Sequence, residues 1–344
     1  MQALILAGGE GTRLRPLTIN TPKPIVPIAN RPFLFYQIDL LKRAGIKEIT
    51  LSLSYQPNKI EGVFGDGEEL GLHIRYVVEA TPMGTAGAYK YSQEHLNQGA
   101  IVFNGDILTD VNVQDVIAFH REKQAAATIM LAPVENPGAY GLVETDADSR
   151  VLRFIEKPKP EQITCNTINA GIYILEPEVL NYIPADEKFS FEYQLFPALL
   201  AAGVRFYAFT WPGYWIDIGT PRRYLQANND LINGRLRSSD VTRPSLKLNE
   251  SDAETIKIDG RSVIDPSCAF KSNVEIVNSV LGPNCLVEER ARIENSVLLS
   301  GTRVGKATEI SDSVIGKGCL IGRNAKVSGA TLGDKTSLTD YTVV

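Results

Sequence analysis

The feature that most constrains the fold is a repeat of 17 residues in the last quarter of the sequence. Aliphatic or aromatic residues recur there at intervals of 6, 6 and 5 positions. They are Ile264, Phe270, Ile276, Leu281, Val287, Ile293, Leu298, Val304, Ile310, Ile315, Ile321, Val327, Leu332 and Leu338. Heptads of a coiled coil and four-stranded propeller blades have other periods, so the repeat excludes both.

A second column of mostly small residues lies four positions after the large ones along the chain. It includes Cys268, Val274, Cys285, Ala291, Thr302, Thr308, Cys319 and Ala325. A three-sided coil of short strands explains both columns, with one large residue in each interior corner and a small one beside it. These hexapeptide-like steps resemble the left-handed parallel β-helix, here with about five coils.

Three cysteines of this segment share the small-residue column. Adjacent coils would place Cys268 and Cys285 roughly 4.8 Å apart, so a metal or a disulfide is one interpretation. The same column also holds Thr302 and Thr336. Because threonines occupy the same column, the favoured interpretation is that the cysteines are small buried residues in a stack.

The preceding part of the chain alternates strand-like and helix-like segments. The runs ALILA, EITLSL, IRYVVE and AIVFN are short and rich in Ile and Val, as buried parallel strands are. Amphipathic stretches cover Phe33–Ala44 and Gln114–Lys123, and Thr220 before Pro221 marks the start of a last helix. This order predicts an α/β fold with a Rossmann-like, doubly wound mixed sheet that binds ligands at the carboxyl ends of its strands.

We therefore expect three parts. Residues 1–236 form a catalytic domain, the polar residues 237–261 form a linker, and residues 262–344 form the β-helix. The sequence contains no run of 18 apolar residues, so we expect no helix that spans a membrane. Its N-terminus lacks the basic start of a signal peptide, so we expect none.

The net charge and the cysteine count indicate which kind of partner and which cellular compartment to expect. The net charge of −5 disfavours a nucleic-acid surface, which leaves a small molecule as the expected partner. Four cysteines without a secretory signal indicate a cytoplasmic protein with reduced thiols. An open end of a solenoid favours covering by another subunit, so we expect a homodimer or higher oligomer built partly through the β-helix.

The stretch LAGGEGTRLRPLT follows the first strand and carries the strongest chemical signal. It matches neither the Walker loop nor the dinucleotide fingerprint, since Gly11 is followed by Thr12 and Arg13. Glycines let backbone N–H groups approach an anion closely, and Arg13, Arg15 and Lys23 add three cations. Such a loop suits a triphosphate, although a glycine turn with solvated arginines would look the same in isolation.

With the PKP that follows, this stretch resembles the signature of the sugar-phosphate nucleotidyltransferases, and other segments of the first half occur in that family's order. The resemblance implies that the loop holds a nucleoside triphosphate, with Arg13 and Lys23 as catalytic cations. It implies nucleotide contacts from Leu6, Gly8, Gly9, Gly11, Thr12, Glu79, Gly84 and Thr85.

The family likeness extends to a metal and a sugar site. FNGDIL and WIDIGTP imply that Asp106 and Asp217 bind Mg²⁺, which typically takes one or two carboxylates plus phosphate oxygens. FIEKP implies that Lys157 grips the phosphate of a sugar 1-phosphate. Sugar contacts are implied for Gly141, Glu156, Asn169 and Gly171.

The residue at position 79 helps to predict which nucleobase the protein binds, and here it is Glu79. Related thymidylyl- and uridylyltransferases commonly carry Gln at this place. A carboxylate only accepts hydrogen bonds, and guanine offers two adjacent donors whereas uracil and thymine offer one donor between carbonyls. Unless Glu79 merely ends a strand and points to solvent, this favours GTP. The closest branch of the family joins GTP to mannose 1-phosphate by in-line attack on the α-phosphorus.

Other functions remain open. A glucose-1-phosphate thymidylyl- or uridylyltransferase of the long form would share the β-helix, and a heptose-phosphate guanylyltransferase is a further option. Hexapeptide acyltransferases generally use a histidine as general base. Acyl transfer by the β-helix is therefore disfavoured, because His73, His95 and His120 all precede it. A regulatory nucleotide-sugar-binding subunit should have lost a cation or carboxylate of the catalytic set. All five catalytic candidates are present, namely Arg13, Lys23, Asp106, Lys157 and Asp217.

Overall fold

The computed structural model describes residues 1–96, 98–236 and 255–344. They form two compact units, the first made of Met1–Glu10 with Leu34–Trp215 and the second of Gly11–Phe33 with Ile216–Val344. The glycine-rich stretch is therefore divided between the units. Its first glycines belong to the first unit, and its cations belong to the second, together with the repeat segment.

The first unit is built on a nine-stranded sheet with the path β10-β9-β11-β6-β1-β4-β5, to which β8 and β12 are added beside β11. β1, β4, β5 and β6 run parallel, whereas β11 is antiparallel to β6, so the sheet is mixed as the sequence predicts. Its strands are β1 Gln2–Leu6, β4 Glu48–Leu53, β5 His73–Val78, β6 Ala100–Asn104, β8 Ala127–Pro133, β9 Gly141–Thr145, β10 Val151–Glu156, β11 Thr167–Leu175 and β12 Phe206–Thr210.

Helices connect these strands. They are α1 Leu34–Arg43, α2 Pro57–Phe64, α3 Gly84–Tyr91, α4 Val113–Glu122 and α5 Phe196–Ala201. A π-helix over Phe191–Leu195 precedes α5. Two further short strands are β7 Ile107–Thr109 and β13 Trp215–Asp217. The two amphipathic stretches predicted as helices correspond to α1 and α4, and the four predicted strands to β1, β4, β5 and β6.

An aromatic cluster fills the core between the sheet and α5. Tyr173, Phe191 and Phe196 are fully buried, and the rings of Tyr173 and Phe196 lie 5.3 Å apart. Aliphatic residues of β6 and β8 surround them, which explains why those strands carry near-continuous apolar runs. This packing fixes the strands whose ends carry the candidate site.

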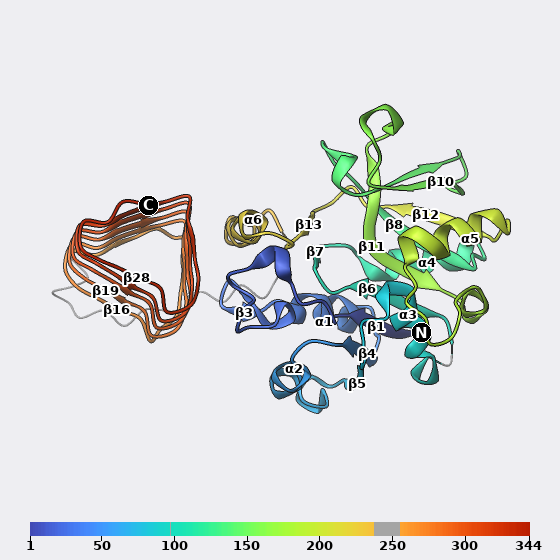
Figure 1. Ribbon diagram of the computed structural model, residues 1–344, viewed down its shortest axis with the longest axis horizontal. Helices are drawn as coiled ribbons and strands as arrows, with labels where there is room; N and C mark the ends of the chain where they lie inside the picture. Colours follow the sequence, from blue (N-terminus) through green and yellow to red (C-terminus); the bar gives the residue numbers. More distant parts are fainter. Residues whose placement is uncertain (97, 237–254) are drawn as a thin grey trace. The chain divides into compact units, whose positions relative to one another are not determined.

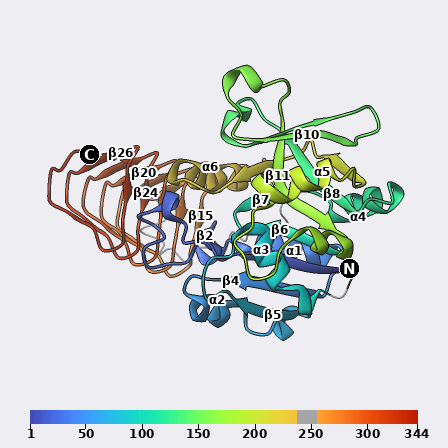
Figure 2. The same ribbon diagram turned by 45° about the vertical axis from the view of Figure 1, so that its right-hand side comes forward.

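The repeat segment forms three parallel sheets of five strands each. Figure 1 looks along this stack, which shows three flat sides, and Figure 2 shows the coils one behind another. Equivalent strands pair at a spacing of 17, as when Val280 faces Val297 and Val297 faces Val314. The sheets contain the strands β14 Lys257–Ile258, β15 Val263–Ile264, β16 Ala269–Phe270, β17 Glu275–Val277, β18 Val280–Leu281, β19 Leu286–Val287, β20 Arg292–Glu294, β21 Val297–Leu298, β22 Arg303–Val304, β23 Glu309–Ser311, β24 Val314–Ile315, β25 Leu320–Ile321, β26 Lys326–Ser328, β27 Thr331–Leu332 and β28 Ser337–Leu338.

This is the predicted five-coil β-helix, and its interior holds both predicted columns. The large residues are buried except the last two, Leu332 and Leu338, which are partly exposed. Among the small residues Cys285 and Cys319 are buried and Cys268 is half-buried, and all three thiols are free. The Sγ atoms of Cys268 and Cys285 donate to backbone carbonyls 14 residues ahead, at 3.2 and 3.4 Å. The thiols thus serve as small buried donors.

Buried serines connect successive coils. The hydroxyls of Ser262, Ser279 and Ser296 each accept the backbone N–H of the serine 17 residues later, at 3.1 Å in all three cases. Ser279 and Ser296 in turn donate to a carbonyl two residues before them. The ladder satisfies backbone groups that the turns between sheets would otherwise leave unpaired.

The second unit also contains two short strands and the last helix. β2 Pro27–Ile28 pairs with β3 Arg31–Pro32, and α6 spans Pro221–Ile232. The Thr220 side chain caps α6 as predicted, accepting from the Arg223 N–H. In the buried contact between them, Asn228 Oδ1 of α6 accepts the Ala29 N–H at 2.8 Å. The proline-rich loop 11–33 is thus packed on α6, and its only helices are the short 3-10 turns Thr12–Leu14 and Lys23–Ile25.

The predicted linker lies mostly outside the described residues. Residues 237–254 are not described, and β14 at Lys257–Ile258 already pairs with β17 of the stack. The first paired strand therefore precedes residue 262, and the domain limits at 236 and 262 stay a proposal. None of the helices within the described ranges is long and apolar enough to cross a membrane.

Candidate active site

The first unit carries the glycines that directly follow β1. Leu6 ends the strand, and its carbonyl accepts the Gly105 N–H at 2.9 Å. A Cβ on Gly8 would lie 2.9 Å from Ser54 Oγ, which donates to the Gly8 carbonyl, so Gly8 is required by its neighbours. A Cβ on Gly9 would meet nothing within 4 Å. The protein itself therefore sets no steric need for glycine at position 9, whose predicted role is approach to a ligand.

Glu79 follows β5 at the carboxyl edge of the sheet and faces inward. The residue is only 8% exposed, which does not fit the alternative of a solvent-directed side chain. Its Oε1 accepts from Ser52 Oγ at 2.7 Å, and its Oε2 accepts the Met83 N–H at 2.8 Å. A carboxylate has about four acceptor positions, so both oxygens can accept one further bond.

The segment after Glu79 is held by residues far along the chain. Gly84 has φ +75°, and a Cβ there would lie 2.7 Å from the Phe189 carbonyl oxygen. Thr85 Oγ1 donates to Glu192 Oε2 at 3.0 Å and accepts the Phe191 N–H at 2.8 Å. The hydroxyl of Thr85 is thus used within the protein, and its predicted nucleotide contact stays a prediction.

Asp106 lies two residues beyond the end of β6, half-buried. The turn between them requires glycine, since a Cβ on Gly105 would lie 2.6 Å from the Leu6 carbonyl oxygen. The ends of β6 and β1 therefore approach closely. This places Asp106 at the edge where Gly8 leaves β1, as the sequence predicts for parallel neighbours.

The four predicted sugar-binding residues come together on adjacent strands. Glu156 at the end of β10 pairs with Gly141 at the start of β9, and a Cβ on Gly141 would lie 2.9 Å from Glu156 Oε2. Next to them on β11, Asn169 Oδ1 accepts the Gly171 N–H at 3.0 Å, and Asn169 Nδ2 donates to the Tyr173 hydroxyl at 2.9 Å. The sheet register thus assembles one polar group from three strands.

Burial raises the pKa of the Glu156 carboxyl, and the nearby Glu192 raises it further, while Lys157 opposes both. Lys157 itself adopts φ +50°, with its N–H bonded to the Tyr140 carbonyl at 3.0 Å and its side chain exposed. This tight turn ends β10 and directs Glu156 and Lys157 to different surroundings.

In the second unit, Arg13, Asp217 and Arg223 surround Gly219. A Cβ on Gly219 would lie 2.7 Å from Asp217 Oδ1 and 3.3 Å from Arg13 Nη2, so only glycine fits between them. Asp217 Oδ1 accepts the Gly219 N–H at 3.0 Å, and Oδ2 pairs with the Arg223 guanidinium. Burial lowers the pKa of Arg223, and the positive charge of Arg13 lowers it further. Two cations with one carboxylate leave a net positive charge that suits an anion.

The rest of the loop is shaped by buried contacts. Gly11 has φ +64° and a carbonyl that accepts from Thr18 Oγ1 at 2.7 Å. Thr12 begins the first 3-10 turn, which places the exposed Arg13 at its centre. Lys23, in contrast, is only 8% exposed.

Sequence reasoning missed Arg223 and Glu192. Arg223 lies in the first turn of α6, where the helix dipole disfavours a cation, and that conflict is a signal of an anionic partner. Glu192 accepts from Ser190 Oγ at 2.6 Å as well as from Thr85, more than a hundred residues away in sequence. No local pattern announces such a contact.

Asn104 and Tyr173 were missed as well. Asn104 Nδ2 lies 3.5 Å from the Tyr173 hydroxyl, and a Cβ on Gly171 would lie 2.9 Å from the same nitrogen. Asn104 Oδ1 is buried without a hydrogen-bond partner in the described structure. Such an acceptor beside the predicted sugar residues is suited to a ligand hydroxyl.

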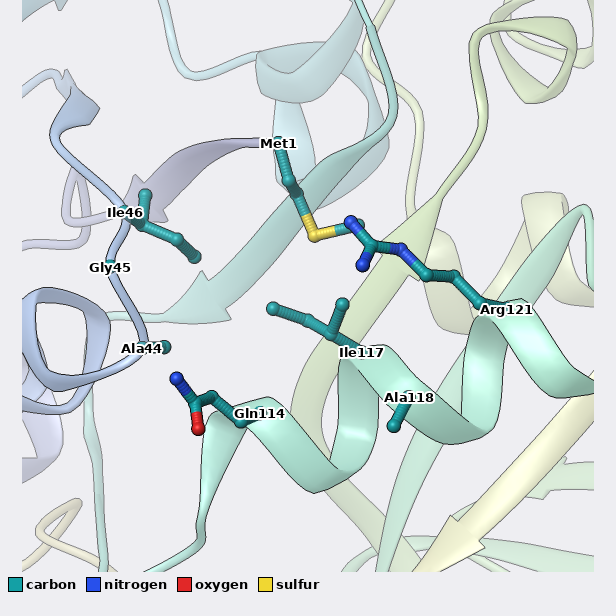
Figure 3. A pocket seen from close by; sticks show the side chains of 8 residues that line it. All are labelled: Met1, Ala44, Gly45, Ile46, Gln114, Ile117, Ala118 and Arg121. Atoms are coloured by element: carbon teal, nitrogen blue, oxygen red, sulfur yellow. The ribbon is translucent and has the colours of Figure 1, made fainter.

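The pocket drawn in Figure 3 lies elsewhere. It has a volume of about 380 Å³ and is lined by Met1, Ala44, Gly45, Ile46, Gln114, Ile117, Ala118 and Arg121. Met1 precedes β1, so this pocket lies at the amino end of that strand. The candidate residues lie at its carboxyl end, where ligands of open α/β sheets bind.

The carboxylates can be tested as Mg²⁺ ligands by their chemistry. The carboxylate oxygens of Asp217 are the hard ligands that Mg²⁺ prefers, and the Gly219 N–H on Oδ1 and Arg223 on Oδ2 orient them. Within residues 1–96, 98–236 and 255–344, no three His, Cys, Asp or Glu side chains form a group that could hold a metal. A magnesium site of one or two carboxylates and substrate phosphates needs no such group.

Comparison with known proteins defines the class. The model of the nucleotidyl transferase family matches residues 2–234, and that of the GMPPB C-terminal domain matches residues 255–344. A crystal structure described as a glucose-1-phosphate thymidylyltransferase from Bacillus anthracis has TM-score 0.61 at 23% identity, over 66% of this chain and 94% of that one. The chain therefore belongs to the nucleotidyl transferase family.

Relatives with assigned names are more specific. A mannose-1-phosphate guanylyltransferase of Mycobacterium tuberculosis is 40% identical over 76% of this chain and 71% of its own length. A mannose-1-phosphate guanyltransferase of Pichia angusta is 38% identical over 78% and 72%. A UTP–glucose-1-phosphate uridylyltransferase of Synechocystis is 34% identical over 81% and 82%. The protein is a nucleotidyltransferase similar to the mannose-1-phosphate guanylyltransferases, as the sequence predicts.

Proposed function

We propose that the protein transfers the guanylyl group of GTP to mannose 1-phosphate, giving GDP-mannose and pyrophosphate. The observation that carries this proposal is the 40% identity to the mannose-1-phosphate guanylyltransferase of Mycobacterium tuberculosis. The inward-facing carboxylate of Glu79 supports it, because guanine presents two adjacent donors that a carboxylate can accept.

The reaction is a direct displacement. An oxygen of the mannose 1-phosphate attacks the α-phosphorus of GTP, the bond from that phosphorus to the bridging oxygen breaks, and pyrophosphate leaves. The protein contributes positioning and charge neutralisation, which dominate such transfers. No covalent enzyme intermediate is required.

The loop residues would bind the triphosphate. Leu6, Gly8, Gly9, Gly11 and Thr12 would offer backbone groups, and the guanidinium of Arg13 and the ammonium of Lys23 would neutralise the phosphates. Glu79, Gly84 and Thr85 would border the base. The cationic surroundings of Arg13 and Arg223 support this assignment.

The sugar phosphate would be bound by the group on β9, β10 and β11. Lys157 would hold its phosphate, and Glu156, Asn169, Gly141 and Gly171 would surround the sugar ring. Asp106 and Asp217 would hold Mg²⁺, which supplies charge neutralisation at the phosphates when bound. Glu156 needs a partner for its carboxyl, since burial raises its pKa, and sugar hydroxyls can hydrogen-bond either protonation state.

A second candidate is uridylyl transfer to glucose 1-phosphate. The Synechocystis relative favours it, because its similarity extends over 81% of this chain. The Glu79 carboxylate argues against it, since a uracil carbonyl would face a buried acceptor.

The direct test is product analysis. The purified protein is incubated with GTP, mannose 1-phosphate and Mg²⁺, and the nucleotides are separated by anion exchange. We expect equal amounts of GDP-mannose and pyrophosphate. Release of free phosphate or GMP without GDP-mannose would contradict the proposal. The proposed cytoplasmic setting is a reducing one and the four cysteines are free, so the assay contains a reductant.

A further inference from the structure

The β-helix contacts the loop that carries Arg13 and Lys23. Both belong to the second compact unit, so the loop and the repeat segment are packed within one unit. Lys317 Nζ, in the turn after β24, donates to Thr21 Oγ1 at 2.8 Å. Thr21 is only 6% exposed and Lys317 is half-buried, so this bond is partly shielded from water.

A second contact of the same coils supports the first. Asp334 lies 17 residues after Lys317, directly above it in the stack. Its Oδ1 accepts the Lys317 backbone N–H at 2.9 Å, and its Oδ2 faces Asn20 Nδ2 at 3.4 Å. The neighbouring Gly333 is closely approached by Pro16, since a Cβ there would lie 3.1 Å from Pro16 Cβ. Three residues of neighbouring coils thus contact the part of the loop that lies between Arg13 and Lys23. They are Lys317, Gly333 and Asp334.

The loop is stiff enough to transmit this contact. Thr21 is separated from Lys23 only by Pro22, whose ring fixes φ, and Pro24 follows. Thr18, buried three residues before Thr21, bonds back to the Gly11 carbonyl at 2.7 Å. Displacement of Thr21 therefore moves Lys23 on one side and the turn of Gly11 on the other.

We propose that Lys317 and Asp334 are positioning residues that hold the triphosphate-binding loop in its active conformation. The β-helix thereby acts on nucleotide binding, although it carries none of the residues that we assign to the reacting groups. The inference rests on the proposed role of the loop. It assigns to the last coils a function beyond their own packing.

The test is the substitution Lys317→Met, which keeps the length of the side chain and removes its donor. We expect KM for the nucleotide that the wild type uses best to rise by about threefold to tenfold, with KM for the sugar 1-phosphate unchanged. Lys317→Arg should restore most of the loss. The melting temperature should be unchanged, because the coil-to-coil backbone pairing does not involve the ammonium group.

Lys306→Met is the matched control. Lys306 also lies in a coil turn and pairs with Glu289, 17 residues before it, at 2.5 Å. In a double-mutant cycle with Thr21→Val, the effects of Lys317→Met and Thr21→Val should not add, whereas those of Lys306→Met and Thr21→Val should.

The outcomes separate the two claims. Wild-type KM in Lys317→Met, an equal loss in Lys306→Met, or additivity with Thr21→Val would overturn the positioning role. Arg13→Met tests the loop itself by calorimetric titration with the nucleotide. Unchanged affinity in Arg13→Met would refute the proposed function of the loop and the inference with it, whereas weakened affinity there with normal behaviour of Lys317→Met would refute the inference alone.

Discussion

At the scale of single residues, three of the charged groups assigned to the candidate site are buried. Glu79, Lys23 and Asp217 are each less than a tenth exposed. Burying an ionised group is expensive unless it is paired. The bonds of Glu79 and Asp217 to backbone N–H groups reduce this cost and leave their remaining acceptor positions for ligands.

The metal assignment predicts the effect of replacing either carboxylate. Asp106→Asn and Asp217→Asn should each lower kcat by about 100-fold or more, because the developing phosphate charge loses part of its neutralisation. Steady-state assays over a range of Mg²⁺ concentrations measure this. Asp115→Asn, exposed in the first turn of α4, is the control and should keep the wild-type rate. Wild-type turnover in either test variant would show that its carboxylate does not bind the metal.

Glu79→Gln addresses the base. The Gln amide can keep both internal contacts, since its oxygen can accept the Met83 N–H and the Ser52 hydroxyl can reverse its role. Stability should therefore change little, while the preference for GTP over UTP should fall by about fivefold or more. Ratios of kcat/KM measure the preference. If the ratio does not change, Glu79 has only the structural role of holding Met83.

His120 predicts a pH dependence of stability. Its ring is buried between Thr128 Oγ1, at 2.7 Å, and Glu176 Oε1, at 3.1 Å. Burial lowers the pKa of His120 below its ordinary value, although Glu176 opposes this shift. The neutral ring is favoured in the folded state, so its contribution is complete above about pH 6.5 and is lost as the pH falls below that value.

Thermal melts between pH 5 and pH 7.5 check this. The melting temperature of the wild type should fall more steeply below about pH 6.5 than that of His120→Gln, which cannot protonate in this range. His73→Gln, exposed on β5, is the control and should follow the wild type. Parallel curves for all three proteins would mean that His120 takes up no proton on unfolding and would contradict this prediction.

At the scale of elements, the serine ladder predicts where the β-helix is sensitive. Ser296 accepts the Ser313 N–H at 3.1 Å and donates to the Glu294 carbonyl at 2.6 Å, fully buried. Ser296→Ala leaves both backbone groups unpaired and should cost about 1–3 kcal/mol of unfolding free energy. Ser328→Ala, at an exposed position that pairs only with Ser311, should cost much less. Denaturation followed by circular dichroism compares the two, and equal losses would contradict the ladder's importance.

The elements divide into those that the sequence predicts and those that it does not. The period of 17 predicted the β-helix because each coil repeats the same local pattern, and large residues recur at every interior corner. Strands β1, β4 and β6 were equally readable, since each is a short buried run that is mostly apolar. β5 was predicted as a buried strand too, but it alternates exposed and buried residues. The antiparallel insertion of β11 beside β6 was not, because its pairing is set by contacts distant in sequence.

The site follows the same division. Asp106 and Gly8 could be placed together because parallel strands end at one edge. The pairing of Arg223 with Asp217 and of Glu192 with Thr85 could not, since neither motif specifies its partner. The attachment of loop 11–33 to the β-helix through Thr21 was also beyond the sequence, where the two segments are nearly 300 residues apart.

At the scale of the whole molecule, we predict self-association through the β-helix. The last two coils present Leu320, Tyr341 and Val343 with large exposed fractions, and solenoid ends need covering. Sedimentation equilibrium of the full chain should give a mass of at least two subunits. Tyr341→Glu should lower that mass, and a monomer at assay concentration would refute the prediction.

The central claim is guanylyl transfer to mannose 1-phosphate, and its most direct test is a panel of GTP, UTP, dTTP and ATP against mannose 1-phosphate and glucose 1-phosphate. We expect the highest kcat/KM for GTP with mannose 1-phosphate, by about tenfold or more over UTP with glucose 1-phosphate. The reverse order, with UTP and glucose 1-phosphate as the best pair, would contradict the account and identify the uridylyltransferase alternative as correct.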